Sequence, residues 1–188
     1  LIARYAKIIT VVAVVFGATS GILGSLVEAP SMVTGFWRLT VALPFFLVPV
    51  LVNNEKREKL KNVSGRDYFW CFVAGAFFFG HFFSWFNAVK FTNVASASVL
   101  AALHPLVVLL VTVFIYRKKV SLKSVAAIAV ALVGGAIIVG ADYSSFAGGS
   151  LKGNILAFLA ALFMGLYFSV GDSVRKRVDG GIYVLLVF

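Results

Sequence analysis

Two long apolar runs fill the segment 68–116, which reads YFWCFVAGAFFFGHFFSWFNAVKFTNVASASVLAALHPLVVLLVTVFIY. Only Lys90-Phe91-Thr92-Asn93 separates them. Each run is about 22 residues long, and at about 1.5 Å per residue each can cross the roughly 30 Å hydrocarbon core of a bilayer. Because the link is so short, the two runs are expected to be antiparallel neighbours. The segment therefore predicts a transmembrane helical hairpin.

The composition of the chain is that of an integral membrane protein. Of its 188 residues, 61% are hydrophobic and 13% are charged, whereas a soluble domain has nearer 25% charged residues. The net charge of +10 lies in short clusters between apolar runs, which is typical of cytoplasmic loops and argues against nucleic acid as a partner. The single cysteine, Cys71, excludes a disulfide framework and a metal–thiolate site within the chain. We therefore predict an all-α, polytopic transmembrane bundle whose first partner is the lipid bilayer.

The apolar runs predict six membrane spans and the beginning of a seventh. They lie at residues 8–27, 32–52, 68–89, 94–116, 120–141 and 151–174, and the seventh begins at 181. If the N-terminus is cytoplasmic, all of the 17 Lys and Arg residues except Arg38, Lys90 and Lys152 fall on the cytoplasmic side. The positive-inside rule then predicts a multi-pass protein of a bacterial or archaeal plasma membrane with its N-terminus in the cytoplasm.

The chain also carries a weak internal repeat. Val15-Phe16-Gly17 and Phe163-Met164-Gly165 occupy equivalent places in the first and sixth spans. Because an odd number of spans separates their starts, the second unit would insert upside down relative to the first, as in the inverted repeats of secondary transporters. We expect residues 1–141 to form a first five-helix unit and residues 142–188 to begin a second, inverted one.

Three blocks of sequence resemble the EamA domain of the drug/metabolite transporter superfamily. The first is Glu28-Ala29-Pro30 with Phe36-Trp37-Arg38, which is similar to the family's acidic-Ala-Pro turn and aromatic-Arg start of helix two. The second, His81 to Ser96, resembles the passage HFxxW…SLxYTSVAS, and the third is His104-Pro105-Leu106, like the family's helix-four proline. The resemblance implies a permease of ten transmembrane helices, built from two inverted five-helix units around a central substrate cavity.

Two departures from the family pattern concern charged residues. Arg117-Lys118 stand where the family often has Gly-Glu, and the segment Gly21–Gly24 lacks the lysine of some branches. The chain opens at Leu1 and stops at Phe188 within an apolar run. We therefore expect it to be a piece of a longer protein that needs a second five-helix half, from the rest of the chain or from a second copy, for transport.

The candidate cavity residues are polar and aromatic groups within the predicted spans. At about 1.5 Å per residue, Arg38, His81 and His104 lie about 9, 12 and 15 Å below the outer ends of their spans. Ionisable groups at such depths are expensive and are often functional. The predicted substrate-binding set is Arg38, His81, Trp85, His104, Thr19, Ser20 and Tyr167. Alternatives stay open, because Arg38 can snorkel to the interface and each histidine can be satisfied across a helix contact.

The residues favour transport over catalysis. An enzyme or a metal site within the membrane would need a nucleophile–base pair or a cluster of metal ligands, and the two histidines have no intramembrane Asp, Glu or Cys partner. No phosphate-binding loop is present, so no ATP hydrolysis and no cofactor are expected. The leading hypothesis is a permease that moves a small organic metabolite or drug-like solute by alternating access, driven by an ion or solute gradient, with a titrating histidine as one route to proton coupling. The alternative is a non-transporting membrane scaffold or the truncated remnant of a transporter.

Overall fold

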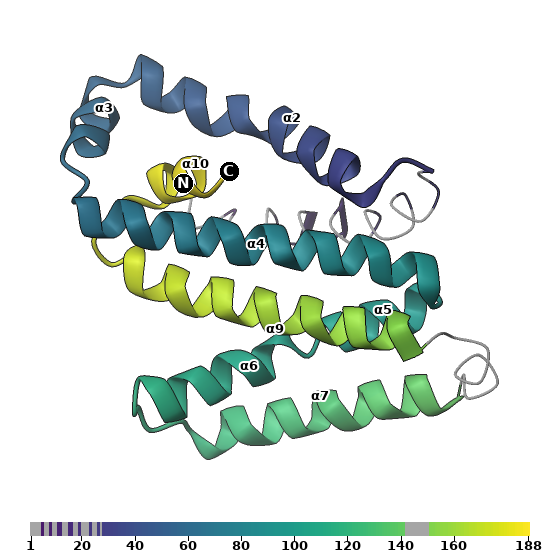
Figure 1. The fold of residues 1–188 in the computed structure, drawn as a ribbon. Helices are drawn as coiled ribbons and strands as arrows, with labels where there is room; N and C mark the ends of the chain where they lie inside the picture. The colour runs from purple at the N-terminus through teal and green to yellow at the C-terminus, as the bar shows by residue number, and fades with distance from the viewer. Residues whose placement is uncertain are drawn as a thin grey trace.

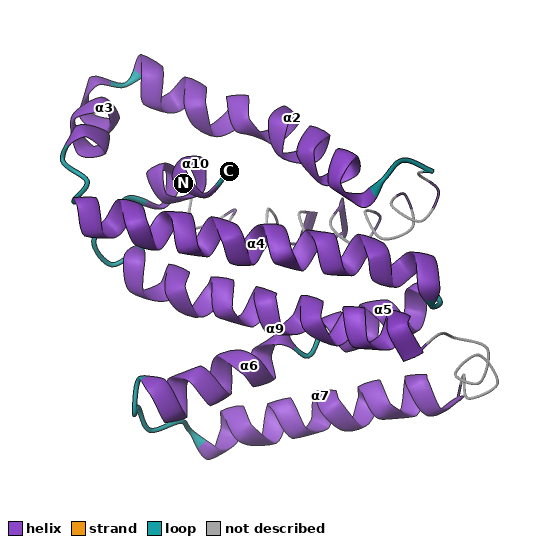
Figure 2. Cartoon of the chain, in the orientation of Figure 1, coloured by secondary structure: helices purple, strands orange, loops and turns teal. Residues whose placement is uncertain are grey.

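The computed structural model describes residues 28–141 and 151–188 continuously, together with isolated positions between residues 5 and 26. Every regular element in these ranges is a helix, which confirms the predicted all-α fold (Figures 1 and 2). The elements are α2 (Ser31–Val52), α3 (Asn54–Lys61), α4 (Gly65–Phe91), α5 (Val94–Ala101), α6 (His104–Leu110), the π-helix η1 (Val111–Ile115), α7 (Leu122–Ala141), α9 (Leu151–Val174) and α10 (Gly180–Val187).

Four segments are long and apolar enough to cross a membrane. They are Met32–Val52, Gly65–Phe91, Val94–Ile115 and Leu151–Val174, while α7 contributes a shorter apolar stretch, Leu122–Gly134. Large apolar side chains on these helices face outward, as Phe45 and Phe114 do, which suits a lipid surround. Most of the predicted first span, 8–27, lies outside the described residues.

The predicted fourth span is a succession of helical pieces. α5 ends at Ala101 and α6 begins at His104, where Pro105 has no backbone N–H to donate to the preceding turn. α6 then widens into η1, and the Tyr116 amide donates to the Val111 carbonyl at 3.0 Å. Such π-turns change the direction in which the following side chains point.

The helix α9 lies at the centre of the described bundle, along α4 on one side and against α5 and α6 on the other (Figure 1). Apart from Val174, the buried residues of α9 are all small: Gly153, Ala157, Ala160, Ala161, Gly165, Ser169 and Gly171. Small side chains let helix backbones approach closely where lipid removes any hydrophobic drive between helices. A Cβ at Gly153 would lie 2.8 Å from the Phe91 carbonyl carbon, so α9 is held at backbone contact with the end of α4.

One end of the bundle carries most of the basic loops, and we call it the basic end: residues 53–64, 117–121 and 175–179 (left in Figure 1). Its helix α3 is capped by Asn53, whose side chain accepts from the amides of Glu55 and Lys56. Lys59 pairs with Glu55, and Lys61 pairs with Glu58 at 2.8 Å. All four of these paired side chains are exposed, so they stabilise α3 only modestly.

Acidification is expected to loosen α3. The hydrogen bond from Lys59 lowers the pKa of Glu55, and that from Lys61 lowers the pKa of Glu58, below the ordinary value of 4.5. A carboxyl with a lowered folded pKa stabilises the fold above its unfolded pKa, and this contribution is lost as the pH falls through the lowered value. Amide-exchange protection of residues 54–61, corrected for intrinsic rates, should therefore be lower at about pH 3 than at about pH 7. Equal protection at both values would contradict this reading of the two pairs.

Candidate functional site

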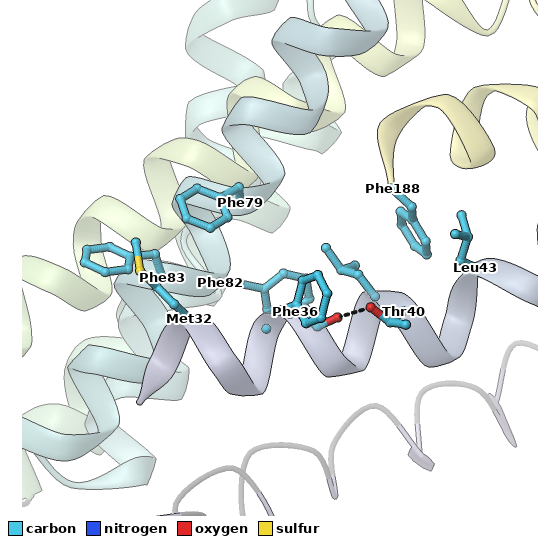
Figure 3. A pocket seen from close by; sticks show the side chains of 10 residues that line it. Met32, Phe36, Thr40, Leu43, Phe79, Phe82, Phe83 and Phe188 are labelled. Carbon is cyan, nitrogen blue, oxygen red and sulfur yellow. Dashed lines mark hydrogen bonds between the residues drawn. The ribbon is translucent and has the colours of Figure 1, made fainter. Parts of the chain in front are cut away.

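A cavity of about 280 Å³ lies between α2 and α4 (Figure 3). Its lining is almost entirely apolar and rich in phenylalanine: Met32, Gly35, Phe36, Leu39, Thr40, Leu43, Phe79, Phe82, Phe83 and Phe188. The Thr40 hydroxyl donates to the Phe36 carbonyl at 2.8 Å, so its proton is already used within α2. The cavity thus offers ring faces and edges as its main contact surface.

Arg38 lies at the margin of this cavity. Its guanidinium carbon is 5.2 Å from the centre of the Phe82 ring, and Phe82 is one of the lining residues. A guanidinium over an aromatic face is held by the ring quadrupole as well as by packing. The Arg38 side chain is exposed on α2, so the arrangement places one positive charge beside an otherwise apolar cavity.

His81 faces the next helix contact, between α4 and α9. Its Nδ1 lies 2.9 Å from the Ala160 carbonyl oxygen, which assigns the proton to Nδ1 and makes it the donor. The half-buried imidazole therefore bridges two helices. On the other flank of this stretch of α4, the next residue, Phe82, carries the Arg38 guanidinium.

His104 lies on the far side of α9. Its Nδ1 is 3.2 Å from the Ala101 carbonyl oxygen of its own helical turn, and its ring centre is 5.4 Å from that of Phe168. It lines a second cavity, of about 420 Å³, with residues of α6, η1, α7 and α9 that include Thr112 of η1 and Ser124 of α7. Arg38 and His104 thus lie next to different cavities, and His81 lies between them.

Trp85 and Tyr167 lie in helix contacts, whereas the hydroxyl of Thr19 bonds within its own turn. Trp85 packs against the buried cluster around Ala97 and Ala157, and Tyr167 packs on Phe78, with ring centres 4.8 Å apart. The Thr19 hydroxyl donates to the Phe16 carbonyl at 2.8 Å, and Ser20 lies outside the described residues. Among the described members of the predicted set, none lines the α2–α4 cavity, although Arg38 contacts its wall.

The phenylalanines that line this cavity are not among the substrate-binding residues predicted from the sequence. Phe79, Phe82 and Phe83 stand at i, i+3 and i+4 and so share one face of α4. That spacing is the sequence signal by which the cavity lining could have been predicted. Aromatic residues that face lipid on one side of a helix have the same spacing, so it does not distinguish the two. Within residues 28–141 and 151–188, no group of three or more His, Cys, Asp or Glu residues lies close enough to hold a metal ion.

A model of the EamA-like transporter family matches residues 4–140, well over half of the chain of 188 residues. No curated protein and no solved structure matches the sequence. The family match covers all three sequence blocks that resemble the EamA domain, and two of the helices that carry them, α2 and α4, line the α2–α4 cavity. The chain belongs to the EamA-like transporter family.

Proposed function

We propose that this protein is a permease that moves a small organic solute across a membrane by alternating access. The observation that carries the proposal is the α2–α4 cavity of about 280 Å³ with Arg38 at its margin. Small-molecule sites are mostly apolar hollows of about 300–1,000 Å³ with a few placed polar groups. A cavity at the lower edge of that range favours a small solute whose planar or apolar part contacts the phenylalanine rings.

The positive-inside rule supports a cytoplasmic location for the basic end, and hence a cytoplasmic N-terminus in a plasma membrane. In this proposal α9 begins a second unit, inverted relative to the first. Its central position against α4, α5 and α6 supports an assembly in which the two units share one interface. A complete transport path then needs the remaining helices of the second unit, from a longer chain or from a second copy.

Efflux from liposomes tests the proposal. The full-length protein is reconstituted into liposomes loaded with a pool of amino acids, nucleosides and organic cations, and the content of each is followed by mass spectrometry. We expect one chemical class to leave faster than from protein-free liposomes, with a rate that saturates as the loaded concentration rises. If no member of the pool leaves faster, the scaffold alternative is favoured instead.

Proton coupling through the histidines makes a separate prediction. His81→Ala removes the imidazole that joins α4 to α9, whereas the hydrogen bond that the described residues give the His104 imidazole stays within its own turn. We expect His81→Ala to lower the efflux rate and to flatten its dependence on pH between about 5.5 and 7.5, where imidazoles titrate. His104→Ala should have the smaller effect. Unchanged rates and pH profiles in both variants would remove the histidines from the mechanism.

A further inference from the structure

A charged hydrogen-bond network ties α4 to the end of α9 at the basic end. Arg177, just after α9, donates from Nη2 and Nε to the same oxygen of Asp67, at 2.7 and 2.9 Å. The hydroxyl of Ser64 donates to the other carboxylate oxygen at 2.8 Å. The Asp67 side chain is 10% exposed and that of Arg177 is 52% exposed, so a nearly buried carboxylate is held by a cation that water can reach.

The network continues to the other neighbour of α9. Arg177 Nη1 donates to the Ser173 carbonyl at 3.1 Å, and the Ser173 hydroxyl donates to the Tyr116 hydroxyl at 3.0 Å. Tyr116 in turn donates to the Ser169 carbonyl at 2.8 Å. Because Tyr116 directly follows η1, the π-helical turn sets the direction in which its side chain meets α9. One continuous set of polar contacts therefore joins α4, α9 and the end of η1.

We infer that the Asp67–Arg177 pair, together with Tyr116, is the gate on the basic side of the permease and that this structure holds it closed. The inference rests on the proposed function. Alternating access needs a contact between the two units at this end that forms in one state and breaks in the other, and the pair with Tyr116 supplies such a contact. In the proposed division of the chain, Asp67 and Tyr116 belong to the first unit and Arg177 to the second.

The surroundings of the pair allow it to open. A polar hollow of about 500 Å³ adjoins it, lined by residues that include Asn62, Arg175 and Asp179. Charges released there enter water, so opening leaves neither partner buried without solvation. The contact between α9 and α6 is different. A Cβ at Gly165 would overlap the Val107 side chain and lie 2.9 Å from the His104 carbonyl oxygen. If α6 and α9 separated there, no solvent could take the place of this close apolar packing.

A neighbouring ion pair provides a matched control. Lys176, in the turn after α9, pairs with Asp172 in the last turn of α9 at 2.9 Å, and both side chains are about 60% exposed. This pair has the same kinds of charge at the same end of the same helix, but it connects α9 only to itself. Neutralising Lys176 changes the local charge as neutralising Arg177 does and leaves the contact between helices intact.

Cysteine labelling tests the gate in the full-length protein. Ser169, which is 4% exposed, is replaced by cysteine in a background in which Cys71 and any further cysteine are alanine, and vesicles that expose the basic side are treated with a water-soluble maleimide. We expect Asp67→Asn and Arg177→Gln each to raise the labelling rate about tenfold or more, because each loses at least one charge-assisted hydrogen bond. Tyr116→Phe should raise it less, Lys176→Gln should not change it, and the exchanged pair Asp67→Arg with Arg177→Asp should restore slow labelling.

The labelling rates distinguish a gate from a pair that only holds the helices together, which we call a static clamp. The efflux assay separately tests the proposed function. Thermal melting of each variant shows whether it is folded. Because Arg177 is half exposed, Arg177→Gln gives a labelling rate even if Asp67→Asn is unstable. If both neutralised variants label as slowly as Lys176→Gln while the wild type transports solute, the pair is a clamp and the gate is overturned. Absence of efflux from wild-type liposomes overturns the proposed function instead.

Discussion

Gly165→Leu is expected to lower the melting temperature of the full-length protein by about 5–10 °C. A Cβ at Gly165 would overlap the Val107 side chain and lie 2.9 Å from the His104 carbonyl oxygen. The first obstacle is a stiff β-branched side chain and the second is backbone, so neither can yield without moving α6 away from α9. Inserting atoms into such packing costs about 1–3 kcal/mol and occasionally more, and each kcal/mol corresponds to about 2–4 °C in a chain of this size.

The same substitution at Gly134 is the control. Gly134 lies within α7, and a Cβ built there meets no atom of the described residues within 4 Å. Leucine is also the better helix former, so Gly134→Leu should melt at or slightly above the wild-type temperature. Thermal unfolding followed by intrinsic fluorescence in detergent compares the two variants. Equal melting temperatures would contradict the close α6–α9 contact.

Gly35→Leu is expected to abolish most transport while leaving the protein folded. Gly35 lines the α2–α4 cavity, and a Cβ there meets no described atom within 4 Å. A leucine side chain can therefore enter the cavity without displacing backbone. Because it occupies space that the proposed solute needs, we expect the efflux rate to fall about tenfold or more, equivalent to about 1.4 kcal/mol of lost binding.

Gly134→Leu again serves as the comparison, since it adds the same side chain to a helix that does not line this cavity. Efflux from liposomes and the melting temperature are measured on the same preparations. The expected pattern is normal melting in both variants and lost efflux in Gly35→Leu alone. Wild-type efflux in Gly35→Leu would mean that the cavity is a groove for lipid chains and that solute passes elsewhere.

The all-α fold and the membrane spans could be predicted from sequence because their signals are local. A span needs about 20 consecutive apolar residues, and lipid leaves a crossing segment few options besides a helix. The segments 32–52 and 151–174 were predicted at the residues where the structure has them. The break before His104 was not predicted, because Pro105 is compatible with a kinked helix as well as with two separate helices.

The candidate site depended on contacts that sequence does not reveal. Counting residues along each span placed Arg38, His81 and His104 at similar depths, but the structure places Arg38 and His104 next to different cavities and His81 at the contact between α4 and α9. Depth does not tell which helix each side chain faces, and that depends on the central position of α9. The Asp67–Arg177 pair was missed for the same reason, since its partners are 110 residues apart and each stands in a charged stretch of sequence between two apolar runs.

The reactivity of a cysteine at Gly35 decides most directly whether the α2–α4 cavity holds solute. With Cys71 and any further cysteine of the full-length protein replaced by alanine, a Gly35→Cys variant is labelled in intact membranes. We expect a water-soluble maleimide to react with it, and the solute identified by liposome efflux to slow the reaction severalfold. Reaction with a lipid-soluble reagent only, at a rate that the solute leaves unchanged, would contradict a solute site between α2 and α4.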